Sequence, residues 1–375
     1  MSRVDKAVSI LQGEYDTIQA QVIKNIIERL NKDDLSKLNS DNVLAWQVKR
    51  LAELGDFNDQ TIKQIASHVN KSHQIVSQIM VSIGSNIKAT TEKELIEVTG
   101  KEPKPTSEID YLMKNYAKMA NDSLDNKINE TLLTRNTATS AQAQAYRDIL
   151  QNTVAKILTG TQEPQKALAD TIYRWQDNGL KTNLIDKAGR NWNVETYANM
   201  VINTAVPKAY AETVKSRMDE YNYHLIVYPE FAAAREDCAR MQGKVVNTVP
   251  ASDPDYDDKY DTIYNHNYGK AGGALGINCR HTDFTIFNPR DMEETKQTVK
   301  PSDAIKQEKL VQNQRRLERA IRKSKLALQS AKELGDEDAQ THYKALIRTQ
   351  QAATRQYVNS HDGLVRQYQR EQIVK

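Results

Sequence analysis

The chain carries two cysteines, Cys238 and Cys279, and the second lies two positions before His281. Thiol and imidazole groups bind zinc, a histidine can activate a cysteine nucleophile, and two thiols can form a disulfide. In an extended segment, residues two apart point to the same side, so Cys279 and His281 can meet. We therefore consider a metal site, a nucleophilic pair, a disulfide and a structural contact between two segments.

Three of these four roles lack part of their sequence pattern. A structural zinc site needs four ligands, usually including a short Cys-x-x-Cys knuckle, but here no knuckle exists and the fourth ligand would have to be His224 or His266. Nothing marks an oxyanion hole or a third catalytic group. A disulfide needs an oxidising compartment, whereas two cysteines and an N-terminus without an apolar signal segment favour synthesis in a reducing cytoplasm. The sequence therefore favours a structural contact without metal or cofactor, and Cys238, Cys279 and His281 remain the metal candidates.

Two nearby loops resemble ligand-binding motifs only in their composition. The acidic stretch 253–261 places Asp258 where a calcium-binding EF-hand loop needs glycine, and Tyr264 stands where that loop needs a bidentate glutamate. The glycine-rich stretch 269–276 does not follow the pattern of a phosphate-binding loop. We expect a solvated acidic loop and no phosphate site.

Residues 58–80 suggest a second possible activity, which is DNA binding. They read as helix, turn and helix, with the small residue Ala66 and with Asn70 at the turn. Base readout would then fall to His73, Gln74 and Gln78. Only Lys63 and Lys71 could neutralise phosphates, and phosphate contacts usually dominate affinity, so a plain helical bundle is the preferred interpretation.

A basic run near the C-terminus offers a second candidate surface for DNA or for an acidic partner. Residues 301–375 carry 15 basic and 9 acidic residues, although the net charge of the whole chain is only +3. A cluster of this kind can contact a DNA backbone, but it is also common on a solvated helix. The run consists of Arg315, Arg316, Arg319, Arg322, Lys323 and Lys325.

The elements that must position these residues are mostly helices. The chain has 375 residues but only 14 glycines and 9 prolines, and its mean hydropathy is −0.71. Such a composition is typical of long helices rather than of one large globule. No run of eighteen apolar residues occurs, so no membrane-spanning segment is expected. We predict an elongated, mainly α protein with a small α/β module.

Breaks in the hydrophobic periodicity divide the chain into four expected parts. Residues 1–105 form an N-terminal helical bundle, which ends at the proline-containing stretch 100–108. Residues 106–222 form a long-helix region, residues 223–290 the small α/β module, and residues 300–375 a C-terminal helical hairpin.

Within these parts the expected helices are 3–31, one ending near Gly55, 58–69, 72–99, several across 109–222 with Pro207 kinking or splitting the last, and two across 302–375 with a break at 333–338. The expected strands are 223–229, 243–249 and 281–287, so that the module holds all the strands that the pattern indicates.

The order of the motifs in the second half resembles a known family. The segment "IVYPEFAAAREDCARMQGKVV", the later "GINCRH" and the basic helix "RRLERAIRKSK" are similar to the phage minor capsid proteins of Gram-positive phages, which are related to the Mu F-like head-morphogenesis proteins. The resemblance is best over about 195–375. It implies that two segments form one structural clasp, made of Arg235, Cys238, Gln242, Gly243, Lys244, Asn278, Cys279, Arg280 and His281.

The resemblance also implies a function and partners. A protein of this family is expected to be a structural component of the virion and not an enzyme. It is expected inside the capsid or at its portal vertex, after assembly in the host cytoplasm without contact with a membrane. Its expected partner is the portal protein, with the major capsid or scaffold protein and the packaged DNA as further partners. It would assist head assembly and DNA ejection. The alternative is a DNA-binding protein that uses residues 58–80 and the basic C-terminal helix.

We expect the portal contact to lie on the helices and not on the α/β module. Amphipathic helices can bury a continuous apolar stripe against another helix, whereas the module has short strands and an acidic loop. We therefore expect the helical N-terminal region, and not the clasp, to supply most of the contact with a portal subunit.

Overall fold

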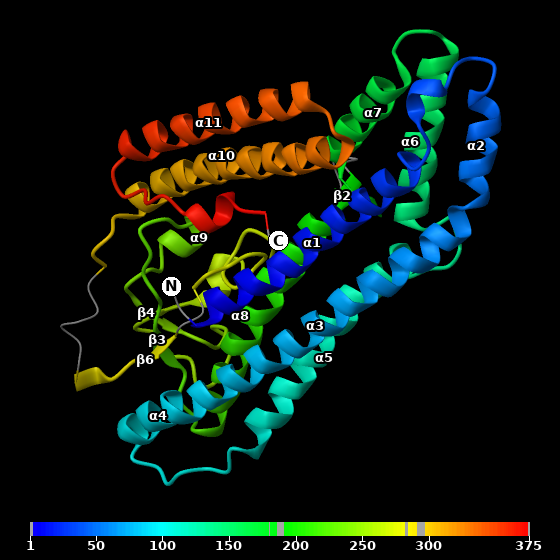
Figure 1. The fold of residues 1–375 in the computed structure, drawn as a ribbon. Coiled ribbons are helices and arrows are strands. Elements are labelled where there is room, and N and C mark those ends of the chain that lie inside the picture. Colours follow the sequence, from blue (N-terminus) through cyan, green and yellow to red (C-terminus); the bar gives the residue numbers. More distant parts are fainter. Residues whose placement is uncertain (1–2, 180, 186–190, 282–283, 291–296, 374–375) are drawn as a thin grey trace.

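Long helices make up most of the computed structural model, which describes residues 3–179, 181–185, 191–281, 284–290 and 297–373 (Figure 1). The fold is therefore mainly α with a small α/β part, as the sequence predicts. The helices are α1 (Arg3–Leu30), α2 (Val43–Ala52), α3 (Leu54–Ala89), α4 (Thr91–Thr99), α5 (Ser107–Thr131), α6 (Ala141–Leu158), α7 (Pro164–Asn178), α8 (Val194–Glu220), α9 (Glu236–Ala239), α10 (Pro301–Leu334) and α11 (Glu337–Asn359), with 3-10 turns at Leu35–Lys37, Ile263–His266 and Tyr368–Glu371.

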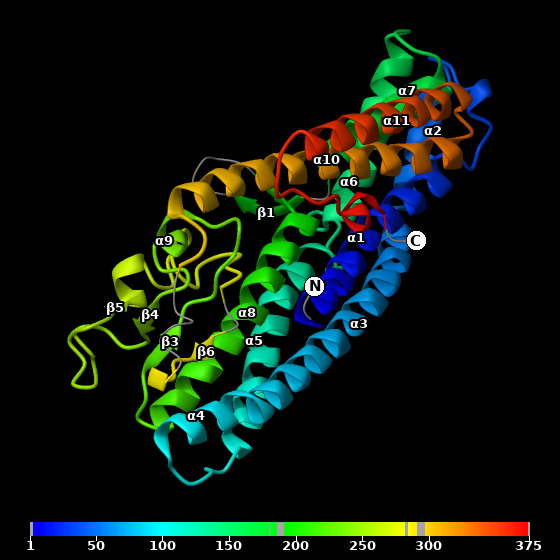
Figure 2. The ribbon, with the colours of Figure 1, turned by 90° about the vertical axis from the view of Figure 1, so that its left-hand side faces the viewer.

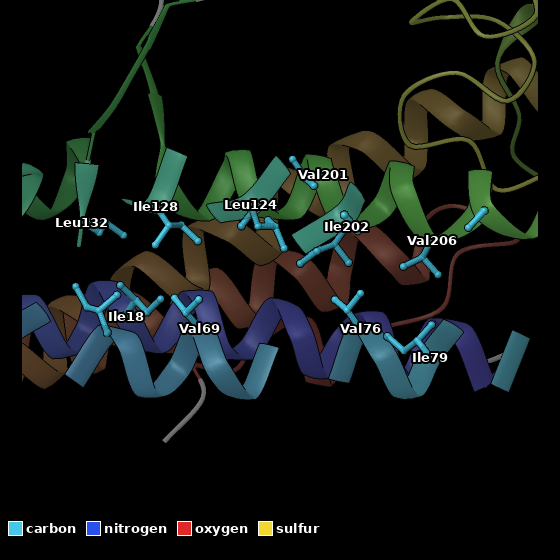
Figure 3. Packing of buried hydrophobic residues seen from close by; sticks show 14 of the residues in the cluster. Ile18, Val69, Val76, Ile79, Leu124, Ile128, Leu132, Val201, Ile202 and Val206 are labelled. Atoms are coloured by element: carbon cyan, nitrogen blue, oxygen red, sulfur yellow. The ribbon is translucent and has the colours of Figure 1, made fainter. Parts of the chain in front are cut away.

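An elongated bundle of α1, α3, α5 and α8 forms the body of the molecule (Figures 1 and 2). Its buried side chains recur every three or four residues, so each helix turns one continuous apolar stripe inward. Figure 3 shows Val76 of α3, Leu124 of α5 and Ile202 of α8 in this shared core. Helices from both sides of the stretch 100–106 thus pack together, while the division of the chain into four domains stays a prediction.

Helix α3 runs without interruption through the segment in which a turn between two helices was expected. The expected turn at Asn70 is wrong, because Asn70 lies on the exposed face in the middle of one helix. The buried stripe continues in phase past this point, through Val69, Ser72 and Val76, and burial of that stripe against α1 and α5 favours a straight helix over a local turn. The break instead falls at Thr90, between α3 and α4.

A two-stranded hairpin interrupts the helices between α7 and α8. Strand β1 (Lys181–Ile185) pairs antiparallel with β2 (Asn191–Asn193). The prediction that all strands lie within 223–290 is therefore wrong; the hairpin is rich in asparagine, which has a low strand propensity, so its pattern is hard to see in the sequence. Helix α8 then continues past Pro207 and is not split there.

The small sheet has four strands in the order β5-β4-β3-β6. Strand β3 (Leu225–Val227) lies between β4 (Val245–Asn247) and β6 (Thr285–Ile286) and pairs antiparallel with both, while β5 (Asp261–Thr262) pairs parallel with β4. The strands expected within 223–229, 243–249 and 281–287 are confirmed, although each is short and positions 282 and 283 lie outside the described residues. Strand β5, inside the acidic loop region, was not expected.

The C-terminal hairpin of α10 and α11 is present and lies along the outside of the bundle, with α10 packed on α1 and α7 (Figure 2). The expectation that its second helix continues to the C-terminus is wrong, because α11 ends at Asn359. Gly363 adopts a positive φ of 78°, and the chain turns back there. The returning tail is held on α10, where Gln314 Nε2 donates to the Val365 carbonyl at 2.9 Å.

Candidate functional site

Two segments of the small sheet bring the cysteines and His281 together. Cys238 lies in α9, between β3 and β4, whereas Cys279 and His281 lie in the loop that leads into β6. Because β3 pairs with both β4 and β6, the connections before these strands meet. The two sulfur atoms and a ring nitrogen of His281 all lie within 4.8 Å of one another, and all three residues are buried.

The hydrogen bonds around His281 determine which ring nitrogen faces the sulfurs. Gln242 Oε1 accepts a backbone hydrogen bond from Phe231 at 2.8 Å and also lies 2.8 Å from His281 Nε2. A carbonyl oxygen only accepts, so His281 Nε2 carries the proton and donates it. In the neutral imidazole, His281 Nδ1 then keeps its lone pair, and it faces Cys279 Sγ at 3.8 Å.

Aromatic rings enclose the same imidazole. The Tyr228 ring stacks on His281 with centroids 5.2 Å apart, and Phe231 packs edge-on against it at 5.0 Å. The Tyr228 hydroxyl donates to Cys238 Sγ at 3.7 Å. Sequence reasoning missed Tyr228 and Phe231, because an aromatic residue next to a strand normally indicates only core packing.

The two thiols influence each other's ionisation. The hydrogen bond from Cys238, together with the contacts of His281, lowers the pKa of Cys279 to about 4, against the opposing effect of burial. The hydrogen bond to Cys279, together with burial, raises the pKa of Cys238 above its usual range. The two shifts have opposite directions, so the thiols titrate as one coupled pair whose first ionisation favours Cys279.

Other residues of the expected clasp hold the loops around this cluster. Arg235 donates to the Ala271 carbonyl at 2.9 Å and to the Ile277 carbonyl, so it joins the start of α9 to the glycine-rich loop. Gly243 has a φ of +68°, and an added Cβ atom would lie 2.8 Å from Gln297 Cα. Position 235 therefore needs the forked guanidinium of arginine, which reaches two carbonyl groups, and position 243 needs a residue without a side chain.

The remaining three residues of the expected clasp do not join the cluster. The side chains of Lys244, Asn278 and Arg280 are exposed. Asn278 has a φ of 56°, and its backbone N–H donates to Thr204 Oγ1 of α8 at 3.3 Å. Of the nine residues of the expected clasp, six thus point inward or bridge loops, and three face the surface.

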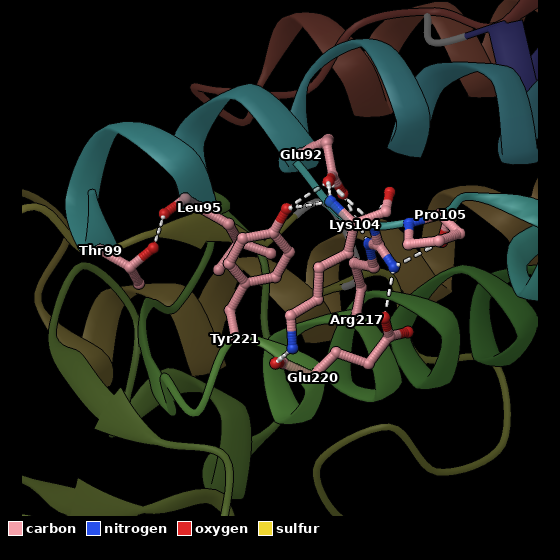
Figure 4. A network of polar contacts seen from close by, with 8 residues as sticks. All are labelled: Glu92, Leu95, Thr99, Lys104, Pro105, Arg217, Glu220 and Tyr221. Atoms are coloured by element: carbon pink, nitrogen blue, oxygen red, sulfur yellow. Dashed lines mark hydrogen bonds and ion pairs between the residues drawn. The ribbon is translucent and has the colours of Figure 1, made fainter. Parts of the chain in front are cut away.

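A buried ionic network joins α4 and the loop after it to α8, and the sequence does not reveal it (Figure 4). Arg217 of α8 donates to both carboxylate oxygens of Glu92 in α4, at 2.5 and 2.7 Å, and also to the backbone carbonyls of Lys104 and Pro105. The Tyr221 hydroxyl donates to Glu92 as well. Burial alone would raise the pKa of Glu92, but the hydrogen bonds from Arg217 and Tyr221 lower it.

The next acidic residue of α4, Glu94, accepts a hydrogen bond from the Ile286 backbone N–H in β6 at 3.2 Å, so α4 connects this network to the sheet.

The candidate DNA-contacting residues are partly used within the chain. His73 Nε2 lies 2.8 Å from Asp125 Oδ1 of α5, and Gln74 and Gln78 are exposed on one continuous helix. The arrangement of two helices that would insert a recognition helix into DNA is therefore wrong for residues 58–80.

Part of the basic run on α10 also has partners within the chain. Arg322 donates to the Arg370 carbonyl at 2.8 Å, and Lys323 donates to the Asp177 carbonyl at 3.0 Å. Arg316 and Arg319 are exposed and Arg315 is half-buried. A cavity of about 380 Å³ lies where this run meets α1, α7 and α11. The run is thus partly a contact surface for the C-terminal tail and for α7.

In the part of the chain that the structure describes, no helix combines the length and the apolar character that crossing a membrane requires.

Comparison with known proteins places this architecture in a family. The family model described as phage minor capsid protein 2 matches residues 2–359. A structural protein of Lactococcus phage LL-H is 33% identical over 360 residues, which cover 95% of this chain and 97% of the relative. A structural protein of Lactococcus phage mv4 is 35% identical over 121 residues, which cover 32% of this chain and 98% of that relative. No solved structure matches the chain. The chain belongs to the phage minor capsid protein 2 family.

Proposed function

We propose that this minor capsid protein is a structural adaptor of the phage head that docks on the portal protein through its helical body. Its family and its relatives are capsid and structural proteins, so a location in the virion and contacts with other virion proteins follow from membership. The portal as partner and the helical body as the docking surface are our own inference. The observation that carries it is an apolar face on α2.

Helix α2 presents two large apolar side chains to the outside. Leu44 is 52% exposed and Val48 is 68% exposed. They are four residues apart and therefore lie on the same face, one helical turn from each other. Fully burying an exposed side chain of this size contributes about 1.5–3 kcal/mol, and the parts of Leu44 and Val48 that are still exposed contribute a corresponding fraction of this. Two such residues form the apolar centre of a contact whose surroundings are polar.

The position of α2 in the molecule fits an adaptor. Figure 1 shows α2 at one end of the elongated bundle, with the small sheet and α4 at the opposite end. A contact through α2 therefore leaves the module free to project away from the partner. In that arrangement the protein would support head assembly and assist DNA ejection, in a structural rather than a catalytic role.

The test uses the full-length chain and the portal protein of the same phage, co-expressed and purified through a tag on the portal. We expect the wild type to be recovered with the portal and the double variant Leu44→Glu, Val48→Glu to be lost. The matched control is Val365→Glu, Tyr368→Glu, which changes two residues of similar exposure, 68% and 59%, in the C-terminal tail. This control is expected to bind as the wild type does.

Each other outcome contradicts part of the proposal. Loss of binding only in the tail variant would move the contact to the C-terminal region. Binding by both variants would exclude the α2 face, and failure of the wild type to bind would count against the portal as partner. In phage carrying the α2 variant, we expect fewer DNA-filled heads by electron microscopy, and a normal yield of infectious particles would contradict a role in head assembly.

A further inference from the structure

We propose that Cys238, Cys279 and His281 bind a zinc ion, which ties α9 to the loop before β6. The donors are the two cysteine thiolates and His281 Nδ1. The proposal does not depend on the portal contact, because the cluster lies in the small sheet and not in α2.

The distances between the three donor atoms are close to those that a zinc ion requires. Zn–S bonds of about 2.3 Å and Zn–N bonds of about 2.0–2.1 Å place tetrahedral donor atoms roughly 3.4–3.8 Å apart. Here all three donor atoms lie within 4.8 Å of one another, and Cys279 Sγ is 3.8 Å from His281 Nδ1. Small side-chain rotations are therefore enough to close the site around an ion.

The groups behind the donors are also arranged as in a metal site. Metal-binding histidines usually donate their second ring N–H to a fixed acceptor, which orients the ring and selects the tautomer. His281 Nε2 donates to Gln242 Oε1, and that oxygen is itself held by the backbone N–H of Phe231. The nitrogen left free to bind an ion is therefore the one that faces the sulfurs.

Three protein donors leave one position of a zinc tetrahedron. The Tyr228 hydroxyl donates to Cys238 Sγ at 3.7 Å, so it is occupied as a hydrogen-bond donor to a ligand sulfur. Among the described residues neither His224 nor His266 joins the cluster, so we assign the fourth position to a water molecule, which makes the site more open than the usual four-ligand structural zinc site. Thiolate ligands favour zinc over calcium or magnesium, which prefer oxygen.

A bound zinc ion would stabilise the small module. The sheet strands are two or three residues long, and α9 has four residues, so backbone pairing alone gives this module little stability. A zinc ion bound in the folded state but not in the unfolded chain adds its binding free energy to folding. It would hold together two segments separated by about forty residues of loop and short strands.

The experiment starts with the wild-type full-length protein, purified without chelators and supplied with zinc chloride. Elemental analysis by mass spectrometry should find about one zinc ion per chain. Both cysteines should resist alkylation until a zinc chelator is added, and both should then become reactive together. Replacement of zinc by cobalt(II) should produce the visible and thiolate charge-transfer bands of a tetrahedral cobalt site.

Variants then identify the donors. Cys238→Ser, Cys279→Ser and His281→Gln should each lose most of the bound zinc and the cobalt spectrum. The matched control is His224→Gln, which changes a buried histidine of the same module outside the cluster and should retain both.

Several outcomes would overturn the proposal. They are a wild type that binds no zinc, thiols that react fully before the chelator is added, and zinc loss in the His224→Gln control equal to that of the cluster variants. A chain whose mass is lower by two hydrogens would show a Cys238–Cys279 disulfide instead. The measurements on the wild type decide the matter even where a variant fails to fold.

Discussion

The change Arg217→Met tests how much the buried ionic network contributes to the stability of the fold. Arg217 is 1% exposed, and it donates hydrogen bonds to Glu92, to Glu220 and to two backbone carbonyls of the loop after α4 (Figure 4). Methionine keeps much of the volume but removes the charge and all of these donors. The Glu92 carboxylate would then stay buried without its cationic partner.

The magnitude follows from the groups left behind. Removing one partner of a buried ion pair costs about 3–5 kcal/mol, because the other charge is left uncompensated. Glu92 retains the hydroxyl of Tyr221 and a longer contact of 3.4 Å with the Lys104 backbone N–H. We therefore expect the lower end, about 3 kcal/mol, as the loss in the free energy of unfolding.

The double variant Glu92→Gln, Arg217→Met separates this explanation from simple loss of packing. Neutral glutamine has no charge to leave uncompensated, so we expect the double variant to recover at least about 1 kcal/mol relative to Arg217→Met alone. The matched control is Glu28→Gln on α1, which breaks an ion pair with Lys24 whose side chains are 43% and 55% exposed. That change should cost less than about 1 kcal/mol.

The assay is urea unfolding at neutral pH, followed by circular dichroism and by tryptophan fluorescence, with the free energy of unfolding obtained by linear extrapolation. A loss below about 1 kcal/mol for Arg217→Met, or a double variant that is less stable than the single one, would refute the reasoning. Equal losses for Arg217→Met and Glu28→Gln would do so as well.

Other expected results can be checked with the same preparations. The pKa of Glu92 is lower in the folded state than its ordinary value of 4.5, so ionised Glu92 stabilises the fold above that pH. This contribution should disappear as pH falls through the folded pKa. Urea midpoints measured across acidic pH should therefore decrease less in the Glu92→Gln, Arg217→Met variant than in the wild type. Gly276→Ala should lower the melting temperature by several degrees, because its Cβ would lie 1.9 Å from the Lys270 carbonyl oxygen, whereas Gly272→Ala, with no atom within 4 Å, should have little effect in calorimetry. Retention on a DNA column should be low, fall steeply with salt and stay unchanged in Gln74→Ala, whereas salt-resistant and sequence-selective retention would contradict our rejection of a helix-turn-helix.

Composition and periodicity were sufficient for the fold class and for most helices. Scarce glycine and proline, with apolar residues every three or four positions, already predict long helices such as α1 and α10, since these signals are local. The strands β3 and β4 were visible for the same reason, as short runs of β-branched residues. The motifs around Cys238 and Cys279 were also enough to suggest the family.

Local signals failed where long-range packing competes with them. Asn70 reads as a turn residue, but burial of Val69, Ser72 and Val76 against other helices favours a straight α3. The reverse occurs at the C-terminus, where an apparent helical stripe ends at Asn359 because the tail returns to bond with α10. In both places the contacts that decide come from residues far away in the chain.

The candidate site shows the same division between sequence and tertiary structure. The sequence names Cys238, Cys279 and His281, but their approach within 4.8 Å depends on the pairing of β3 with both β4 and β6. The tautomer of His281 depends on Gln242, and the burial of Arg217 depends on α4 meeting α8. Residue types therefore determine which chemistry is available, while tertiary structure decides which groups meet, because donor geometry and desolvation exist only after the chain has folded.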